Sequence, residues 1–89
     1  MSKDDTTRVA LIGIIVDSDN VGDVAIDKLN GLLHSYSKYI IGRMGVPYHK
    51  KNISIISVAI DAPNDVISAL SGKLGAIKGI STKTVYSKA

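Results

Sequence analysis

Residues 8–16 read RVALIGIIV, and this stretch decides the fold. Almost every position is apolar, which is typical of a strand that is covered on both sides. Alternation along such a strand would give two apolar faces, which are Val9, Leu11 and Ile15 on one side and Ala10, Ile12, Ile14 and Val16 on the other. Residues 53–61 (ISIISVAID) repeat the pattern, with Ile56, Val58 and Ile60 on one face and Ile53, Ile55 and Ala59 on the other. We therefore expect these two strands to occupy the centre of a sheet.

Each of these strands is followed by a helical pattern. Residues 17–20 (DSDN) are N-cap types, and residues 21–36 then repeat apolar side chains at three- and four-residue spacing. The predicted stripe consists of Val21, Val24, Ala25, Leu29, Leu32 and Tyr36. A second helix is predicted from Pro63 to Gly75, and its buried face is Val66, Ile67, Leu70 and Leu74.

Two less apolar segments complete the pattern. Residues 39–48 mix isoleucines with glycines and Pro47, which predicts an irregular edge strand. Gly79 predicts a turn, and residues 80–86, rich in Thr and Lys, predict a second edge strand. The order β, α, β, β, α, β indicates an α+β, ferredoxin-like sandwich with a four-stranded antiparallel sheet and two helices on one face. Residues 1–7 are expected to form a disordered tail, and residues 8–89 a single domain.

The composition narrows the class of protein. The 89 residues contain no cysteine, which excludes disulfides, thiolate metal sites and thiol nucleophiles. The longest apolar run is too short to span a bilayer and lacks the flanks of a signal peptide, so a cytoplasmic location is expected. No triad of nucleophile, base and acid is readable from the spacing, and the chain is expected not to be an enzyme.

The predicted topology leaves one face of the sheet without helices. The central strands would then expose an apolar patch. It would be formed by Ile12, Ile14, Ile55 and Ala59, or by the adjacent residues that point to the opposite face of each strand. Because such patches on small domains mark interfaces, we expect a homodimer or homotetramer that packs through the sheet.

Residues 71–75 (SGKLG) invite comparison with a phosphate-binding loop. The comparison fails, because that motif needs a glycine where Ile67 stands and a Ser or Thr where Leu74 stands. A helix end with a glycine stop explains the run better. Gly72 nevertheless points away from the predicted core, which close approach by a ligand or another chain would explain.

Metal and nucleic-acid binding have weaker support. His34 shares a polar helix face with Asn30, Asp27 and Asp23, which could hold a divalent cation but also fits a solvated face. Basic side chains could contact phosphate, but only Tyr48 and Tyr86 are placed to stack on bases and no nucleic-acid-binding motif is present. We therefore do not expect direct binding to nucleic acid.

Three segments carry a family resemblance. Residues 69–75 (ALSGKLG), continued by Ile77, Gly79, Ile80, Lys83 and Thr84, resemble the C-terminal signature of small proteins provisionally described as regulators of the iron-only hydrogenase system. Residues 43–47 (RMGVP) and 29–34 (LNGLLH) are also similar to that family.

The resemblance implies an ACT-like domain, similar to the ligand-sensing half of the nickel-responsive transcription regulator. Proteins of that kind sense a small ligand or metal at a subunit interface and pass the change to a partner. Two departures argue against direct transfer: only His34 and His49 are available for a nickel site without cysteine, and residues 1–7 are too short for a DNA-binding arm.

The sequence thus favours a regulatory domain, of transcription or of the hydrogenase system, that binds an unidentified ligand at an oligomer interface. The candidate ligand-binding residues are Arg43, Gly45, Ser71, Gly72 and Lys73, with Asp17 and Asn20 as a second place beside a helix N-terminus. The alternatives are a metal-responsive protein that uses His34 and a module that binds only other proteins. No cofactor is identified.

Overall fold

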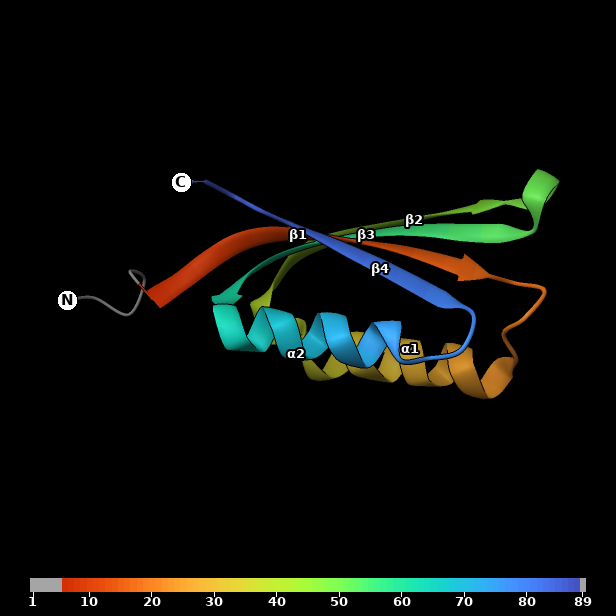
Figure 1. Cartoon of the computed structure of the whole chain (residues 1–89), viewed down its shortest axis with the longest axis horizontal. Coiled ribbons are helices and arrows are strands. Elements are labelled where there is room, and N and C mark those ends of the chain that lie inside the picture. Colours follow the sequence, from red (N-terminus) through yellow and green to blue (C-terminus); the bar gives the residue numbers. More distant parts are fainter. Residues whose placement is uncertain (1–5, 89) are drawn as a thin grey trace.

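A computed structural model describes residues 6–88 of the chain (Figure 1). Within these residues the elements follow the predicted order β, α, β, β, α, β, with a 3-10 turn on either side of the second strand. Their bounds are β1 Thr7–Asp17, α1 Asp23–Ser35, η2 Ser37–Tyr39, β2 Ile40–Tyr48, η3 His49–Lys51, β3 Ile53–Pro63, α2 Asn64–Gly75 and β4 Ile80–Tyr86.

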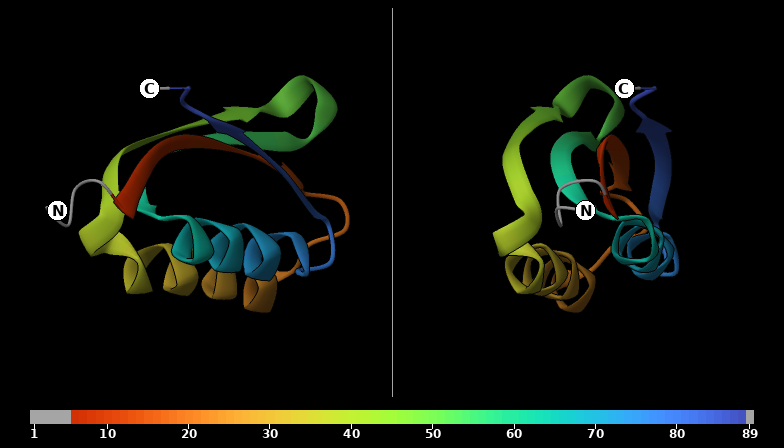
Figure 2. Two further views of the ribbon diagram at one scale, coloured as in Figure 1. Left: turned by 60° about the vertical axis from the view of Figure 1, so that its left-hand side comes forward. Right: turned by 90° about the vertical axis from the view of Figure 1, so that its left-hand side faces the viewer.

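The strands form one antiparallel sheet in the order β2-β3-β1-β4. The two most apolar strands, β1 and β3, occupy its centre. The edge strand β2 contains Pro47, and the edge strand β4 contains two threonines. Both helices lie on the same face of the sheet, α1 toward β2 and α2 toward β4 (Figure 2). The predicted ferredoxin-like sandwich is therefore confirmed.

The core lies between the sheet and the helices. On β1 the residues that face it are Ala10, Ile12, Ile14 and Val16, each at most 3% exposed. The helices contribute Leu29 and Leu33 from α1 and Ile67, Leu70 and Leu74 from α2. The predicted buried face of the second helix is confirmed at these three residues of α2, and Val66 packs at its margin.

The first helix differs from its prediction in two respects. It begins at Asp23 with Gly22 at the N-cap, and the carboxylate of Asp17 accepts hydrogen bonds within the preceding turn. Val24, predicted to lie in the apolar stripe, is 82% exposed. It precedes the buried Leu29 by five residues, which at 3.6 residues per turn is about 140° around the helix.

Backbone geometry explains the turns and the edges. The predicted turn at Gly79 has φ of +84°, and an added Cβ there would lie 2.6 Å from Cγ1 of Val21. The turn between β2 and β3 ends at Asn52 in the left-handed region. A register shift between Ile40 and Gly42 makes β2 irregular, as predicted for an edge strand.

The ends of the elements differ slightly from the prediction. Thr7, assigned to the tail, is already paired with Pro63, while residues 1–5 of that predicted tail lie outside the described residues. β3 continues to Pro63, so the second helix starts one residue later than expected. None of the helices in the described part of the chain is long and apolar enough to cross a bilayer.

Candidate functional site

The face of the sheet opposite the helices is apolar, and no helix within residues 6–88 covers it (Figure 2). We call it the outer face. Strand alternation places on it side chains that the core does not use, and many are large and half-exposed. They are Val9, Leu11 and Ile15 of β1, Met44, Val46 and Tyr48 of β2, Ile55 of β3 and Val85 of β4.

The predicted patch is correct for β3 and wrong for β1. Ile12 and Ile14 were the first choice for the exposed set, but both are fully buried because the helices cover their side of β1. Their neighbours Leu11 and Ile15 are exposed, by 46% and 39%. Ile55 was placed correctly, at 44% exposed.

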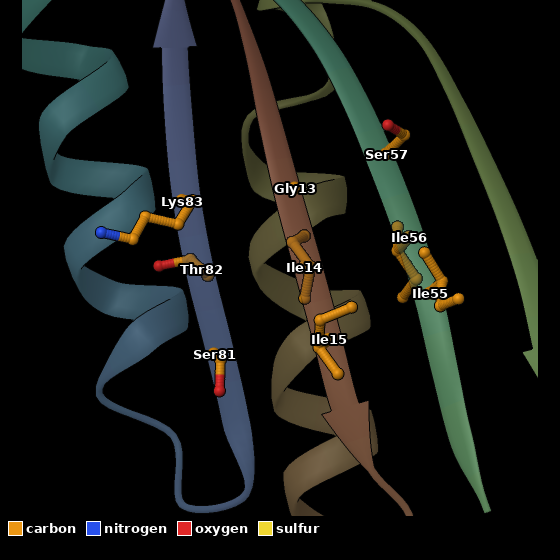
Figure 3. Close-up of a pocket in the computed structure, with 9 residues that line it drawn as sticks. All are labelled: Gly13, Ile14, Ile15, Ile55, Ile56, Ser57, Ser81, Thr82 and Lys83. Carbon is orange, nitrogen blue, oxygen red and sulfur yellow. The ribbon is translucent and has the colours of Figure 1, made fainter. Parts of the chain in front are cut away.

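One hollow of the outer face, of about 230 Å³, is lined by Val9, Leu11 and Val85 and contains no glycine. Two others each lie beside a glycine. One, of about 310 Å³, surrounds Gly13 in the middle of β1 and is lined on the outer face by Ile15, Ile55, Ser57, Ser81 and Lys83. Figure 3 shows that the side chain of Lys83 is directed away from β1. The other hollow, of about 290 Å³, lies around Gly42 and Ala59, between Leu11 and Met44.

The strand register aligns these residues in rows across the sheet. Gly13 is opposite Ser57 of β3, and Ser57 is in turn opposite Met44 of β2. The row on one side consists of Leu11, Ala59 and Gly42, so it has a large residue on β1 and small residues on β3 and β2. The row on the other side consists of three large residues, which are Ile15, Ile55 and Val46. The sequence prediction did not include Gly13, Gly42 or Met44 in a site of this kind, because only the register brings them into line.

The first five predicted ligand-binding residues fall into two groups at opposite edges of the sheet. Arg43 and Gly45 belong to the edge strand β2 and alternate there with outer-face residues. Ser71, Gly72 and Lys73 belong to α2, which packs mainly against the other edge strand, β4. One chain therefore does not bring the two groups together.

Side chains of the α2 group already have partners in the fold. The hydroxyls of Ser71 and Thr84 are 3.0 Å apart, which ties α2 to β4. Lys73 Nζ donates a hydrogen bond to the Tyr36 hydroxyl at 3.0 Å and lies 5.4 Å from the centre of its ring. Gly72 is exposed, and no described atom would lie within 4 Å of an added Cβ. The protomer itself therefore does not require a glycine there.

Asp17 and Asn20 lie in the loop between β1 and α1, where hydrogen bonds hold them. Asn20 Nδ2 donates to Asp17 Oδ2 at 2.7 Å, and the Asp19 N–H donates to Asp17 Oδ1 at 3.1 Å. Asn52, in the turn between β2 and β3, donates its side-chain amide to the Asp19 carboxylate. This arrangement fixes the loop that precedes the N-terminus of α1.

His34 is exposed on α1, on the polar face where the sequence placed it with Asn30. Among residues 6–88, no group of three or more His, Asp or Glu side chains is placed to hold a metal ion. A site at His34 would therefore need ligands from outside the described part of one chain.

Comparison with known proteins now gives the family. The sequence model of the TM1266-like family, provisionally described as an iron-only hydrogenase system regulator, matches residues 8–84. The structure is similar to that of the uncharacterized protein TM1266 from Thermotoga maritima, with a TM-score of 0.85 and 39% identity over 92% of this chain and 99% of that one. None of the curated proteins is detectably similar in sequence.

The fold has a second, more distant match. The ACT domain from the GTP pyrophosphokinase of Chlorobium tepidum has a TM-score of 0.70 at 18% identity, over 90% of this chain and 100% of that domain. An identity this low shows a shared fold only. The family match confirms the resemblance carried by residues 29–34, 43–47 and 69–75. The chain belongs to the TM1266-like family and has the ferredoxin-like fold of an ACT domain.

Proposed function

We propose that this chain is a regulatory domain that senses a small ligand and works as a homo-oligomer assembled through its outer face. The family to which it belongs is provisionally described as a regulator, and its fold is that of ACT domains, which often sense ligands. The observation that carries the proposal is the apolar outer face, which the helices of the chain leave open.

The size of this face supports an interface. Its eight large apolar side chains are between 39% and 67% exposed. Together they leave on the order of 700 Å² in water, at least as much as the largest patch on a typical monomer, about 300–600 Å². Patches of this size commonly mark a site of protein interaction, and a second copy of the chain offers the same apolar chemistry.

The ligand is proposed to bind where two copies meet. Arg43 and Gly45 lie at one edge of the sheet and Ser71, Gly72 and Lys73 near the other, both on the helix side. Only a contact between neighbouring copies away from the outer-face pair, as a tetramer would provide, could bring the two groups together. An anion would suit the guanidinium of Arg43 and the exposed backbone around Gly72. The loop with Asp17 and Asn20 is a second candidate, and its carboxylates would favour an amine.

Native mass spectrometry of the purified protein tests both parts of the proposal. We expect a dimer or tetramer at micromolar concentration, with the mass of a small molecule retained by the assembled species. A monomer throughout a dilution series, without any bound molecule, would contradict the proposal. If a ligand is retained, the variants Arg43→Gln and Lys73→Gln should release it while the oligomer persists.

A further inference from the structure

We infer that two copies of this chain pack outer face against outer face about a two-fold axis along β3, with Met44 of each copy filling the hollow over Gly13 of the other. The inference rests on the proposed assembly through the outer face and adds to it one particular register. The occupant of each hollow is thus a side chain of an identical chain.

The first support is the order of large and small residues across the outer face. β3 lies between β2 and β1, and in two neighbouring rows one of these flanking strands has a large apolar residue where the other has a glycine. In one row the large residue belongs to β2, and in the next row it belongs to β1. Met44 of β2 is in the row of Gly13 of β1, whereas Gly42 of β2 is in the row of Leu11 of β1. The outer face therefore contains both the large side chains and the spaces that would receive them.

A two-fold axis along β3 uses this order directly. Rotation about such an axis exchanges the places of β1 and β2 and keeps every row opposite itself. Met44 then meets Gly13 of the other copy, and Leu11 meets Gly42. Packed sheets keep their strand directions within about 30° and lie about 10 Å apart, a distance that side chains from both sheets fill by interdigitating.

The second support is the position of the hollows. The larger hollow surrounds Gly13, where Met44 of the other copy would enter, and the second surrounds Gly42, where Leu11 would enter. Met44 is also among the most exposed apolar side chains of the face, at 66%. A flexible, unbranched methionine is well suited to fill an irregular space.

The third support is that the protomer does not require either glycine. Neither residue has a positive φ, and a Cβ on Gly13 would make only an ordinary contact, 3.7 Å from the carbonyl oxygen of Lys83. A Cβ on Gly42 would have no described atom within 4 Å. Glycine inside a strand weakens it and often marks close approach by another chain or a ligand.

Charge favours this axis over a more central one. An axis between β3 and β1 would place Lys83 opposite Met44 of the other copy, so that a charged residue would face an apolar one. With the axis along β3, β4 lies beyond the edge of the other copy and Lys83 stays hydrated. Asp61, the next outward residue of β3 after Ala59, is exposed and marks the end of the apolar contact.

Exchanging the large and small residues tests the register. In Gly13→Met the new side chain occupies the hollow and collides with Met44, so we expect dimer affinity to fall by about tenfold or more in sedimentation equilibrium. The double variant Gly13→Met with Met44→Gly restores a large residue opposite a glycine and should recover most of that loss. Gly31→Met, on the exposed surface of α1, is the control and should leave affinity unchanged.

Cysteine crosslinking gives an independent measurement, because the natural chain has no cysteine. Ser57 lies on the proposed axis, so Ser57 of one copy faces Ser57 of the other copy. A short bismaleimide should therefore crosslink the Ser57→Cys variant. Lys83→Cys, in the same row but beyond the overlap, should not be crosslinked.

The outcomes separate the register from the assembly. If Gly13→Met is monomeric and the double variant stays monomeric, or if Lys83→Cys is crosslinked better than Ser57→Cys, the register is wrong while assembly through the face stands. If Gly13→Met assembles like the natural chain, the register is also wrong. If the natural chain itself is monomeric, the proposed assembly fails together with the register. Circular dichroism establishes that each variant is folded.

Discussion

Replacing Ile55 with threonine should weaken self-association without unfolding the protomer. Ile55 is 44% exposed on the outer face, so assembly has nearly half of its surface left to bury. Full burial of such a side chain contributes about 1.5–3 kcal/mol, so the exposed part is worth about 1 kcal/mol in each copy. A symmetric dimer loses this twice, or about 2 kcal/mol, which is roughly a 30-fold increase in Kd. Threonine keeps the β-branched shape that favours a strand.

Sedimentation equilibrium over a dilution series measures this change. The matched control is Val24→Thr on α1, which removes a β-branched apolar side chain that is 82% exposed but lies away from the outer face. We expect the control to associate like the natural chain. If Ile55→Thr associates as tightly as Val24→Thr while both are folded, the outer face is not the surface through which copies assemble.

Further predictions concern the stability of the protomer, measured by urea denaturation at a fixed protein concentration. Gly79→Ala should lose at least about 2 kcal/mol, since φ is +84° and the new Cβ would lie 2.6 Å from Val21. Leu70→Ala should lose about 2–5 kcal/mol, because Leu70 is fully buried between α2 and the sheet. Asp17→Ala should lose about 1 kcal/mol, since it removes the acceptor of two hydrogen bonds in the loop before α1.

The sequence predicted the element order and the central strands because hydrophobic alternation records burial directly. β4 begins and ends where predicted, and α2 ends at Gly75 as expected. The error at Val24 arose because the predicted helix began at Val21, two residues early. Val21 lies before the observed helix, and its three-residue spacing from Val24 joined Val24 to an apolar stripe on another side of the helix. Where apolar residues occur on both sides of the first turn of a helix, their spacing in the sequence does not show which side packs against the core.

The outer face was harder to predict than the core. Both faces of residues 8–16 are apolar, so alternation divides the strand into two sets without saying which set the helices cover. The rows that join Met44 to Gly13 depend on the pairing of β2 with β3 and of β3 with β1, and the register shift near Gly42 adds to the difficulty. No local pattern in a single sequence contains that alignment.

The composition of β1 bears on what the working unit is. A strand that is apolar on both sides is typical of one with both faces covered, but the helices cover only the side of Ile12 and Ile14. The other side, with Leu11 and Ile15, has the composition of an interior and the exposure of a surface. A second copy would remove this mismatch. The two sets should then respond differently to substitution: changes at Ile12 should reduce protomer stability, whereas changes at Leu11 should act mainly on assembly and on any ligand that depends on it.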